Sequence, residues 1–304
     1  MKSVAILTPT YNRANLLPQL YQSLVRQTCF DFKWYIIDDG SVDDTETVVQ
    51  GFCAEKFEIY YCKKENGGKH TACNLGFSII QEELTFIVDS DDFLTETAVE
   101  TIVEDWKEYR KSKNIVGLSY HRIHKNGEII GDVYTGGETV VQSFIDMRVN
   151  GNIKGDSAEI YKTEILDKFR FPEIDGEKFL SEAVLWNRIA DYGYKLAYIS
   201  KGIYYCSYLE GGLTSKGRLK QIQNPKGTFL HAKSYLSKKV KISIRIKYML
   251  MYIAIAKFAN ISYNKAFDEC NNKILFITEF LPAMVLNLIW KKFNAESKSG
   301  NECL

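Results

Sequence analysis

The sequence predicts an α/β protein with a mostly parallel central sheet flanked by helices, followed by a helical C-terminal extension. Short apolar runs rich in β-branched and aromatic residues alternate with helical patterns through the first ninety residues. Nearly continuous apolar runs are typical of strands that are covered on both faces. Strands separated by helices are typical of βαβ units and a parallel sheet. The predicted strands lie at 4–7, 34–37, 57–61 and 84–88, and the predicted helices at 16–24, 42–54 and 71–82.

The rest of the chain has a less regular pattern. A charged amphipathic helix is expected at 96–112, and a second helix at 181–192 after an irregular stretch. From about residue 218 the pattern becomes helical, basic and then apolar. We therefore predict one domain over residues 1–217, with halves at 1–95 and 96–217, and a helical region over 218–304.

Charge is distributed unevenly along the chain, although the formal net charge is only +1. Residues 1–210 hold 23 basic and 33 acidic side chains, whereas residues 211–267 hold 12 basic and no acidic ones. Such a block predicts contact with an anionic surface. No nucleic-acid-binding motif accompanies it, so we expect no nucleic-acid partner.

Seven cysteines are scattered along the chain without any C-x-x-C spacing. This pattern predicts neither a zinc site nor a disulfide framework and is typical of a reducing, cytoplasmic compartment. Met1-Lys2-Ser3 runs directly into a strand pattern, which is not that of a signal peptide.

Polar and acidic side chains follow the predicted strands, at the edge where open parallel sheets bind ligands. Asp and Ser after a strand also commonly cap the next helix. Capping explains any one of these segments, but it does not require three carboxylates within four residues. The segments are Thr8-Pro9-Thr10-Tyr11-Asn12-Arg13, Asp38-Asp39-Gly40-Ser41, Asn66-Gly67-Gly68-Lys69 and Asp89-Ser90-Asp91-Asp92.

Neither the dinucleotide-binding glycine motif nor a P-loop follows the first strand, where Tyr11-Asn12-Arg13 stands instead. A bound nucleotide diphosphate therefore needs another source of positive charge. Asp89, Asp91 and Asp92 supply hard oxygen ligands for Mg²⁺ or Mn²⁺, which in turn binds phosphate oxygens.

In order and spacing, these four segments resemble the inverting family-2 glycosyltransferases of bacteria, which have the GT-A fold. The segment beginning Asn66-Gly67-Gly68 extends, in this resemblance, to Asn74-Leu75-Gly76. The resemblance implies a UDP-sugar donor, with Tyr11 stacked on the base and Asp39 accepting a hydrogen bond from it. The further roles that it implies are Thr8 and Pro9 shaping the base pocket, Lys69 near the diphosphate, Asp89 at the ribose or a metal-bound water, Asp91 on the metal, and Asp92 as second ligand or helix cap.

Glu182 is the predicted catalytic base, because inverting transfer needs one group to take the proton of the incoming hydroxyl. The family has an acidic pair at the start of this helix, and here Ser181 replaces the first acid while Leu185 and Arg188 keep their places. Glu182 is otherwise a favourable acid at a helix N-terminus. The alternatives for the base are Asp156, Asp175 and Glu177. The resemblance also implies a loop after this helix that covers the diphosphate, either through Lys216 or Arg218 or through the glycines and hydroxyls of the loop.

Two stretches near the C-terminus, around 248–256 and 274–290, are apolar, and basic residues precede the first. Neither stretch qualifies cleanly as a membrane-spanning helix, which needs about 20 apolar residues. We predict peripheral contact with the inner face of the cell membrane, with a helical subdomain or a dimerisation element as the alternative.

The predicted function is metal-assisted transfer of a sugar from a UDP-sugar to a saccharide acceptor, lipid-linked in our interpretation, during surface polysaccharide or cell-wall glycan synthesis. The alternatives are a catalytically silent module that binds nucleotide sugars and a sugar nucleotidyltransferase.

Overall fold

The computed structural model describes residues 2–134, 136–206 and 217–301. The chain forms two compact units, which we consider separately. Unit 1 comprises Met1–Glu173 and Tyr192–Tyr208, and unit 2 comprises Ile174–Asp191 and Leu209–Leu304.

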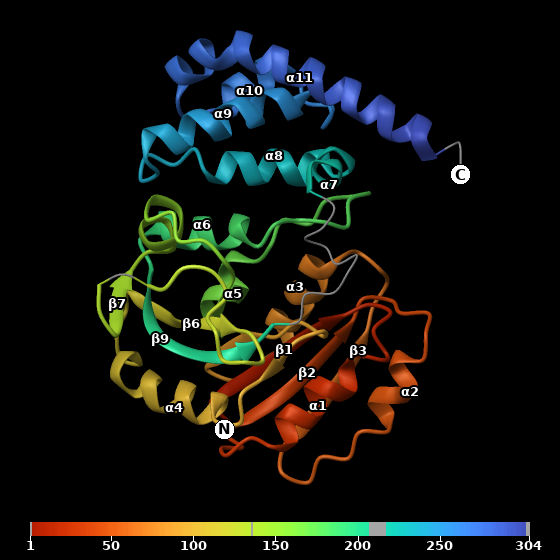
Figure 1. Cartoon of the computed structure of the whole chain (residues 1–304), viewed down its shortest axis with the longest axis vertical. Coiled ribbons are helices and arrows are strands. Elements are labelled where there is room, and N and C mark those ends of the chain that lie inside the picture. The colour runs from red at the N-terminus through yellow and green to blue at the C-terminus, as the bar shows by residue number, and fades with distance from the viewer. Residues whose placement is uncertain (1, 135, 207–216, 302–304) are drawn as a thin grey trace. The chain divides into compact units, whose positions relative to one another are not determined.

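Unit 1 is built on a nine-stranded sheet within the described residues (Figure 1). The strand order is β3-β2-β1-β4-β8-β6-β9-β5, and β7 pairs with β9 outside this path. The strands are β1 Val4–Thr10, β2 Phe32–Asp38, β3 Glu58–Lys63, β4 Leu84–Ile87, β5 Phe93–Leu94, β6 Ile115–Ile123, β7 Thr139–Gln142, β8 Ser157–Lys162 and β9 Lys195–Tyr205.

The sheet is parallel in the half that the sequence predicts well and mixed in the other half. β1 pairs in parallel with both β2 and β4, and β2 pairs in parallel with β3. β8 is antiparallel to β4 and β6, whereas β6 and β9 are parallel. The mixed α/β fold with helices on the sheet confirms the predicted fold class. The later strands escaped prediction because β6, β8 and β9 carry tyrosine, serine and histidine between their apolar residues.

Helices cover both faces of this sheet. Apolar residues of α1 and α4 pack with Val4, Ile6 and Trp34 in the main core of unit 1. On the opposite face α3 lies so close to β1 that a Cβ on Gly76 would meet the Leu7 side chain. The helices of unit 1 are α1 Leu17–Val25, α2 Thr45–Gln50, α3 Lys69–Ile79, α4 Ala98–Tyr109, a π-helical turn at Ile145–Asn150, and α5 Thr163–Phe169.

Unit 2 is helical and has its own core. In Figure 1 the helices α8, α9 and α11 follow one another as layers, and their apolar residues form one cluster that includes Phe229, Tyr252 and Trp290. The helices are α6 Ala183–Tyr192, whose last residue belongs to unit 1, α7 Gly217–Gln223, α8 Pro225–Ser234, α9 Ile242–Ala256, α10 Tyr263–Glu269 and α11 Lys273–Asn301.

Residues 174–191 pack with these helices, although the sequence analysis places them in the first domain. The reason is a buried carboxylate. Glu177 accepts hydrogen bonds from the backbone N–H groups of Lys226 and Gly227, each at 2.8 Å. These groups lie in the first turn of α8, where helix N–H groups have no partner within the helix.

One helix of the described residues, Lys273–Ala295, is long and apolar enough to cross a membrane by length and composition. It is the second of the two apolar C-terminal stretches, neither of which qualifies cleanly as a spanning helix from the sequence. The stretch qualifies because Pro282 lies inside one continuous helix, so the apolar residues on both sides of it belong to a single segment.

Candidate active site

The carboxyl ends of β1, β2 and β4 form one edge of the parallel half-sheet. Thr10 lies opposite Asp38, and the Asp39 N–H donates to the Thr10 carbonyl at 2.8 Å. Beyond the β1–β4 pairing, the Val88 N–H donates to the Leu7 carbonyl at 2.9 Å. The pairing therefore brings the three polar segments that follow these strands to the same edge, as the sequence predicts.

Tyr11 is the exposed aromatic residue of this edge. Its side chain is 46% exposed, whereas Thr8 and Pro9 are buried within β1. The Thr8 hydroxyl accepts a hydrogen bond from Trp34 Nε1 at 2.9 Å. Tyr11 is thus open to stack on a planar ligand, and Thr8 supports the strand beneath it.

Asn12 fixes the backbone that follows Tyr11. It adopts a left-handed conformation with φ 51°, which asparagine tolerates better than most residues. Its N–H donates to Ser41 Oγ at 2.8 Å, and its Oδ1 accepts from the Val42 N–H at 2.9 Å. The loops after β1 and β2 are therefore clasped together.

Asp39 is 3% exposed, and the loop after β3 uses both of its carboxylate oxygens. The N–H groups of Gly67 and Gly68 donate to them at 2.9 and 2.6 Å, and Lys64 Nζ lies 2.9 Å from Oδ1. Asn66 Nδ2 is a further donor at 3.2 Å. Here the carboxylate anchors the loop, and its predicted hydrogen bond with a nucleotide base stays a prediction.

Asp89 and Asp92 flank a cation that the sequence analysis missed. Arg122, on β6, places Nη1 3.7 Å from Asp89 and 3.5 Å from Asp92, and its guanidinium lies 4.3 Å from the Tyr204 ring centroid. The Tyr204 hydroxyl donates to Asp92 at 2.8 Å and accepts from the Asp89 N–H at 3.0 Å. Lys69 Nζ hydrogen-bonds to Asp89 Oδ1.

These contacts set the charge state of the group. Burial would raise the pKa of Asp89, but Lys69 and Arg122 outweigh it and lower that pKa below its usual value. Burial would lower the pKa of Arg122, yet Tyr204, Asp89 and other acidic neighbours raise it well above its usual value. Asp89 and Arg122 are therefore both charged at neutral pH.

Asp91 differs from its two neighbours. Its carboxylate lies 3.8 Å from Arg13 Nη1, which is beyond hydrogen-bond distance, and its side chain is 26% exposed. Counting only cations of the described residues, Asp91 is the one of the three aspartates whose oxygens face the least competition.

The predicted base belongs to unit 2. Glu182 is half-buried directly before α6, and its carbonyl accepts from the N–H groups of Leu185 and Trp186. Ser181 precedes it, and its carbonyl accepts from Val184. Glu182 thus lies immediately before the helix, which begins at Ala183 rather than at the predicted residue 181.

The alternatives to Glu182 are placed as follows. Glu177 is buried with both oxygens on backbone N–H groups, an arrangement that suits helix capping rather than proton transfer. Asp175 is exposed. Asp156 is exposed before β8, in unit 1, and contributes to the raised pKa of Arg122. Lys216 and the side chain of Arg218 lie outside the described residues.

Comparison with known proteins identifies the unit that carries this edge. Residues 5–152 match the profile described as Glycosyl transferase family 2. They form a family-2 glycosyltransferase domain. The match includes Tyr11, Asp39, Lys69 and the acids from Asp89 to Asp92, all of which were predicted as site residues.

Curated relatives of the glycosyltransferase include two from Streptococcus pneumoniae. Glycosyltransferase GlyG is 25% identical over 66% of this chain and 69% of its own length. Glycosyltransferase GlyA is 24% identical over 69% of this chain, but the match spans only 31% of that longer protein. The GalNAc(5)-diNAcBac-PP-undecaprenol beta-1,3-glucosyltransferase of Campylobacter jejuni is 25% identical over 95% of this chain and 93% of its own length.

Among solved structures, S. aureus TarS 1–349 in complex with UDP-GlcNAc superposes with a TM-score of 0.62. It is 18% identical, and the match covers 92% of this chain and 79% of TarS 1–349. At this identity the likeness establishes the fold alone, and it confirms the predicted GT-A architecture.

The glycosyltransferase was predicted to hold a metal ion with Asp89, Asp91 and Asp92. Across the described ranges, no group of three or more His, Cys, Asp and Glu side chains is arranged to bind one. The physical reason is that Asp89 and Asp92 lie against Arg122. A site resting on all three acids does not fit, whereas a site resting on Asp91 and donor phosphates does, because Mg²⁺ is commonly held by one or two carboxylates plus substrate phosphates.

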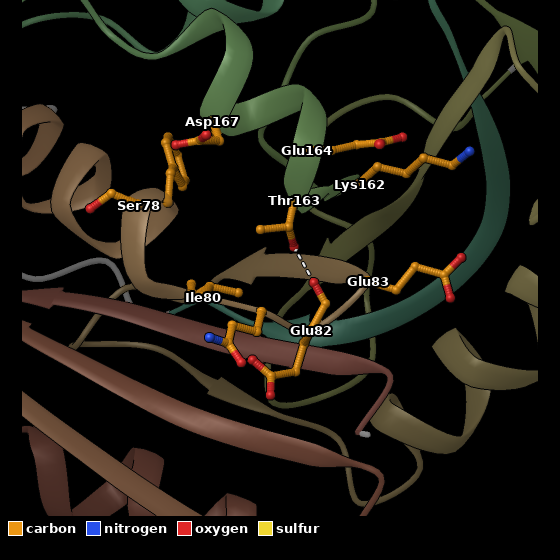
Figure 2. Close-up of a pocket in the computed structure, with 10 residues that line it drawn as sticks. Ser78, Ile80, Glu82, Glu83, Lys162, Thr163, Glu164 and Asp167 are labelled. Atoms are coloured by element: carbon orange, nitrogen blue, oxygen red, sulfur yellow. Dashed lines mark hydrogen bonds between the residues drawn. The ribbon is translucent and has the colours of Figure 1, made fainter.

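A cavity of about 500 Å³ lies at the opposite edge of the sheet (Figure 2). Glu82 and Glu83 precede β4, whereas Asp89 to Asp92 follow it, so the cavity is at the amino end of the strand. Glu164 and Asp167 of α5 also line it, and the Thr163 hydroxyl donates to the Glu82 carbonyl at 2.6 Å. Its acidic lining is unsuited to a diphosphate, so we do not assign the donor to it.

Arg122, Tyr204 and Lys64 are the site residues that sequence reasoning missed. Arg122 and Tyr204 lie on strands without a recognisable motif, 30 or more positions from the acids that they contact. Lys64 directly precedes Glu65 and the predicted glycine segment, and its closeness to that segment was the only usable signal.

Proposed function

We propose that the chain is an inverting glycosyltransferase that moves a sugar from a UDP-sugar to a hydroxyl of a lipid-linked saccharide. The setting would be the synthesis of surface polysaccharide or cell-wall glycan. The UDP-GlcNAc complex of TarS supports the donor class. The name of the Campylobacter relative, which aligns with nearly the whole chain, supports a polyprenol-diphosphate-linked acceptor.

The observation that carries the proposal is that Tyr11 and Asp91 lie at the same strand-end edge. Arg13, two residues after Tyr11, approaches Asp91, so an exposed aromatic ring and a weakly paired carboxylate belong to the same site. A base stacked on Tyr11 would place the diphosphate on the side of the acids. Lys69, close to Asp89, is our candidate for a direct contact with the phosphates.

A divalent cation, Mn²⁺ or Mg²⁺, is part of the proposal. Asp91 would hold it together with the donor phosphates, and Asp89 would act at the ribose or through a metal-bound water. When bound, such an ion stabilises the negative charge that develops on the departing diphosphate. Asp92 is then left to orient Arg122 and Tyr204.

Glu182 is the proposed base. The incoming hydroxyl becomes acidic only as its bond to the sugar forms, so a carboxylate is basic enough to take the proton. Because a single displacement inverts the anomeric centre, the base and the leaving diphosphate act from opposite faces of the sugar. Asp156 is the remaining alternative in unit 1 if Glu182 fails the test below.

The donor site is tested by titrating the protein with UDP, with and without Mn²⁺, by calorimetry. We expect Mn²⁺ to strengthen UDP binding in the native protein and to have no such effect in Asp91→Asn. Glu104→Gln, which removes an exposed carboxylate from α4, is the matched control and should behave as the native protein does. Equal Mn²⁺ dependence in native and Asp91→Asn protein would refute the assignment of Asp91.

The base is tested with Glu182→Gln. UDP affinity should persist, while sugar transfer falls by about 10²–10⁴, the usual contribution of a general base. The anomeric proton signals of donor and product, read by NMR, should show opposite configurations. Normal transfer by the variant would move the base elsewhere. UDP binding without transfer or donor hydrolysis by the native protein would instead indicate a silent binding module.

We further propose that the enzyme works at the cytoplasmic face of the membrane, where a lipid-linked acceptor resides. The excess of basic residues over 211–267 supports an anionic surface as its partner.

A further inference from the structure

α11 carries an exposed apolar stripe on one side. Ile277, Leu281 and Val285 are 65%, 75% and 58% exposed, and Ile274 and Leu288 continue the same row. Their steps of three and four residues place them on one face of the helix. From 274 to 290, all within the described part of the chain, no exposed position of α11 carries a charged side chain. Apolar surface of this extent marks an interaction site.

The opposite face of α11 is already in use. Phe276, Ala283 and Trp290 are buried in the core of unit 2, and the Asn287 side chain donates to the Ala254 carbonyl of α9 at 2.6 Å. A spanning helix would have to present its other side to lipid or to further spanning helices. Because α11 is held to α9 by its apolar core and by a buried hydrogen bond, it can offer only its outer face.

Charge at the two ends of α11 indicates what covers that face. Lys273 begins the helix, and Lys291 and Lys292 lie past the end of the stripe, all three exposed. If two copies paired through the stripe in antiparallel fashion, Lys273 would meet Lys291 and Lys292 of the partner. Parallel pairing would bring identical lysines together. Both arrangements set like charges against each other, whereas an anionic lipid surface attracts both ends.

We propose that α11 lies flat in the interface of an anionic membrane, with the row Ile274, Ile277, Leu281, Val285 and Leu288 inserted among the lipids. The inference rests on the proposed lipid-linked acceptor, and it assigns the membrane contact to a defined surface. In this proposal α11 neither spans the membrane nor pairs with α11 of a second copy.

The test is flotation of the full chain with vesicles of phosphatidylcholine, alone or mixed with phosphatidylglycerol. We expect flotation with the mixed vesicles and much less with the neutral ones. The triple variant Ile277→Gln, Leu281→Gln, Val285→Gln should lose more than about a hundredfold in partitioning, given the transfer cost of three large apolar side chains. Extraction at alkaline pH should release the native protein from the vesicles.

The matched control replaces three exposed apolar residues of unit 1 with glutamine: Ile79, Val133 and Val141. It should float as the native protein does, and both triple variants should keep the native melting temperature because all six positions are exposed. The proposal is overturned if the α11 variant still floats, if the native protein binds no vesicle or resists alkaline extraction, or if light scattering shows a dimer that the α11 variant dissociates.

UDP binding measured on the same samples separates this inference from the proposed function. Loss of flotation with intact UDP binding in the α11 variant supports the membrane surface, and it leaves the donor site unaffected. Absence of UDP binding in the native protein would refute the proposed function, whatever the vesicles show.

Discussion

Replacing Tyr204 by phenylalanine tests the group of charges beneath the acidic edge. The ring keeps its place against Arg122, and only the hydroxyl is lost. That hydroxyl donates to the Asp92 carboxylate at 2.8 Å and accepts from the Asp89 N–H at 3.0 Å, and the side chain is fully buried. Water therefore has no easy access to replace either bond.

The magnitude follows from the two bonds. A hydrogen bond to a charged group contributes about 1.5–3 kcal/mol, and a buried donor left without a partner costs about 1–3 kcal/mol. Because Arg122 still faces Asp92 at 3.5 Å, that carboxylate keeps a partner, and the lower end of each range applies. We expect the free energy of unfolding to fall by about 2.5 kcal/mol.

Urea denaturation measures this loss, with Tyr205→Phe as the control that removes a hydroxyl from the next position of β9. Tyr205 is only half-buried and stacks on Phe93, so its variant should stay within about 0.5 kcal/mol of the native protein. A loss below about 1 kcal/mol in Tyr204→Phe would contradict the argument, because the hydroxyl would then contribute no more than an ordinary neutral hydrogen bond.

Three further predictions concern a cap, a partly buried histidine and a turn. Glu177→Ala should speed hydrogen exchange at the first turn of α8 and cost about 2 kcal/mol, with Lys178→Ala as the neutral control. Burial lowers the pKa of His231 to about 4. The free energy of unfolding should therefore be at its full value above pH 6.5 and fall by about 2 kcal/mol by pH 5, as the unfolded chain takes up a proton. Chemical denaturation of His231→Phe should show no such loss. Gly40→Ala should lower the free energy of unfolding by more than about 1 kcal/mol, since φ is 81° and the added Cβ would lie 2.9 Å from a backbone nitrogen. Gly127 has φ 86° and open space around it, so Gly127→Ala measures the cost of the backbone conformation without the steric contact.

The parallel half of the fold could be predicted because its strands are covered on both faces. Buried runs such as Ile36-Ile37 are continuous, and the predicted strand at 34–37 lies within β2. β6 has no such continuous apolar run, because Ser119 and His121 alternate with Leu118 and Tyr120. All four are buried, and inside the protein Ser119 hydrogen-bonds to the Tyr134 hydroxyl while the His121 ring stacks on the Tyr134 ring. Composition alone cannot distinguish such a strand from an exposed segment.

The candidate site was predictable to the extent that its residues are adjacent in sequence. Asp89, Asp91 and Asp92 were found because they follow one strand, and their shared edge with Tyr11 follows from the parallel pairing. The difference between Asp91 and the other two aspartates in their contacts with cations was not predictable. It depends on Arg122, which is brought close only by the pairing of β6 with β8 and β9. A cluster of acidic residues in the sequence therefore does not show how many of their carboxylates remain available to bind a metal ion in the folded protein.

The charges at this edge also bear on the need for a divalent ion. In the described part of the edge, Asp89, Asp91 and Asp92 face Lys69, Arg122 and Arg13, so three negative charges meet three positive ones. A nucleotide diphosphate adds negative charge to a group that is already balanced. If Lys69 turned to the phosphates, Asp89 would keep only Arg122, which it shares with Asp92. The proposed divalent ion on Asp91 would supply the missing charge, and the proposed Mn²⁺ dependence would then follow from the same electrostatic balance as the pairing of Arg122.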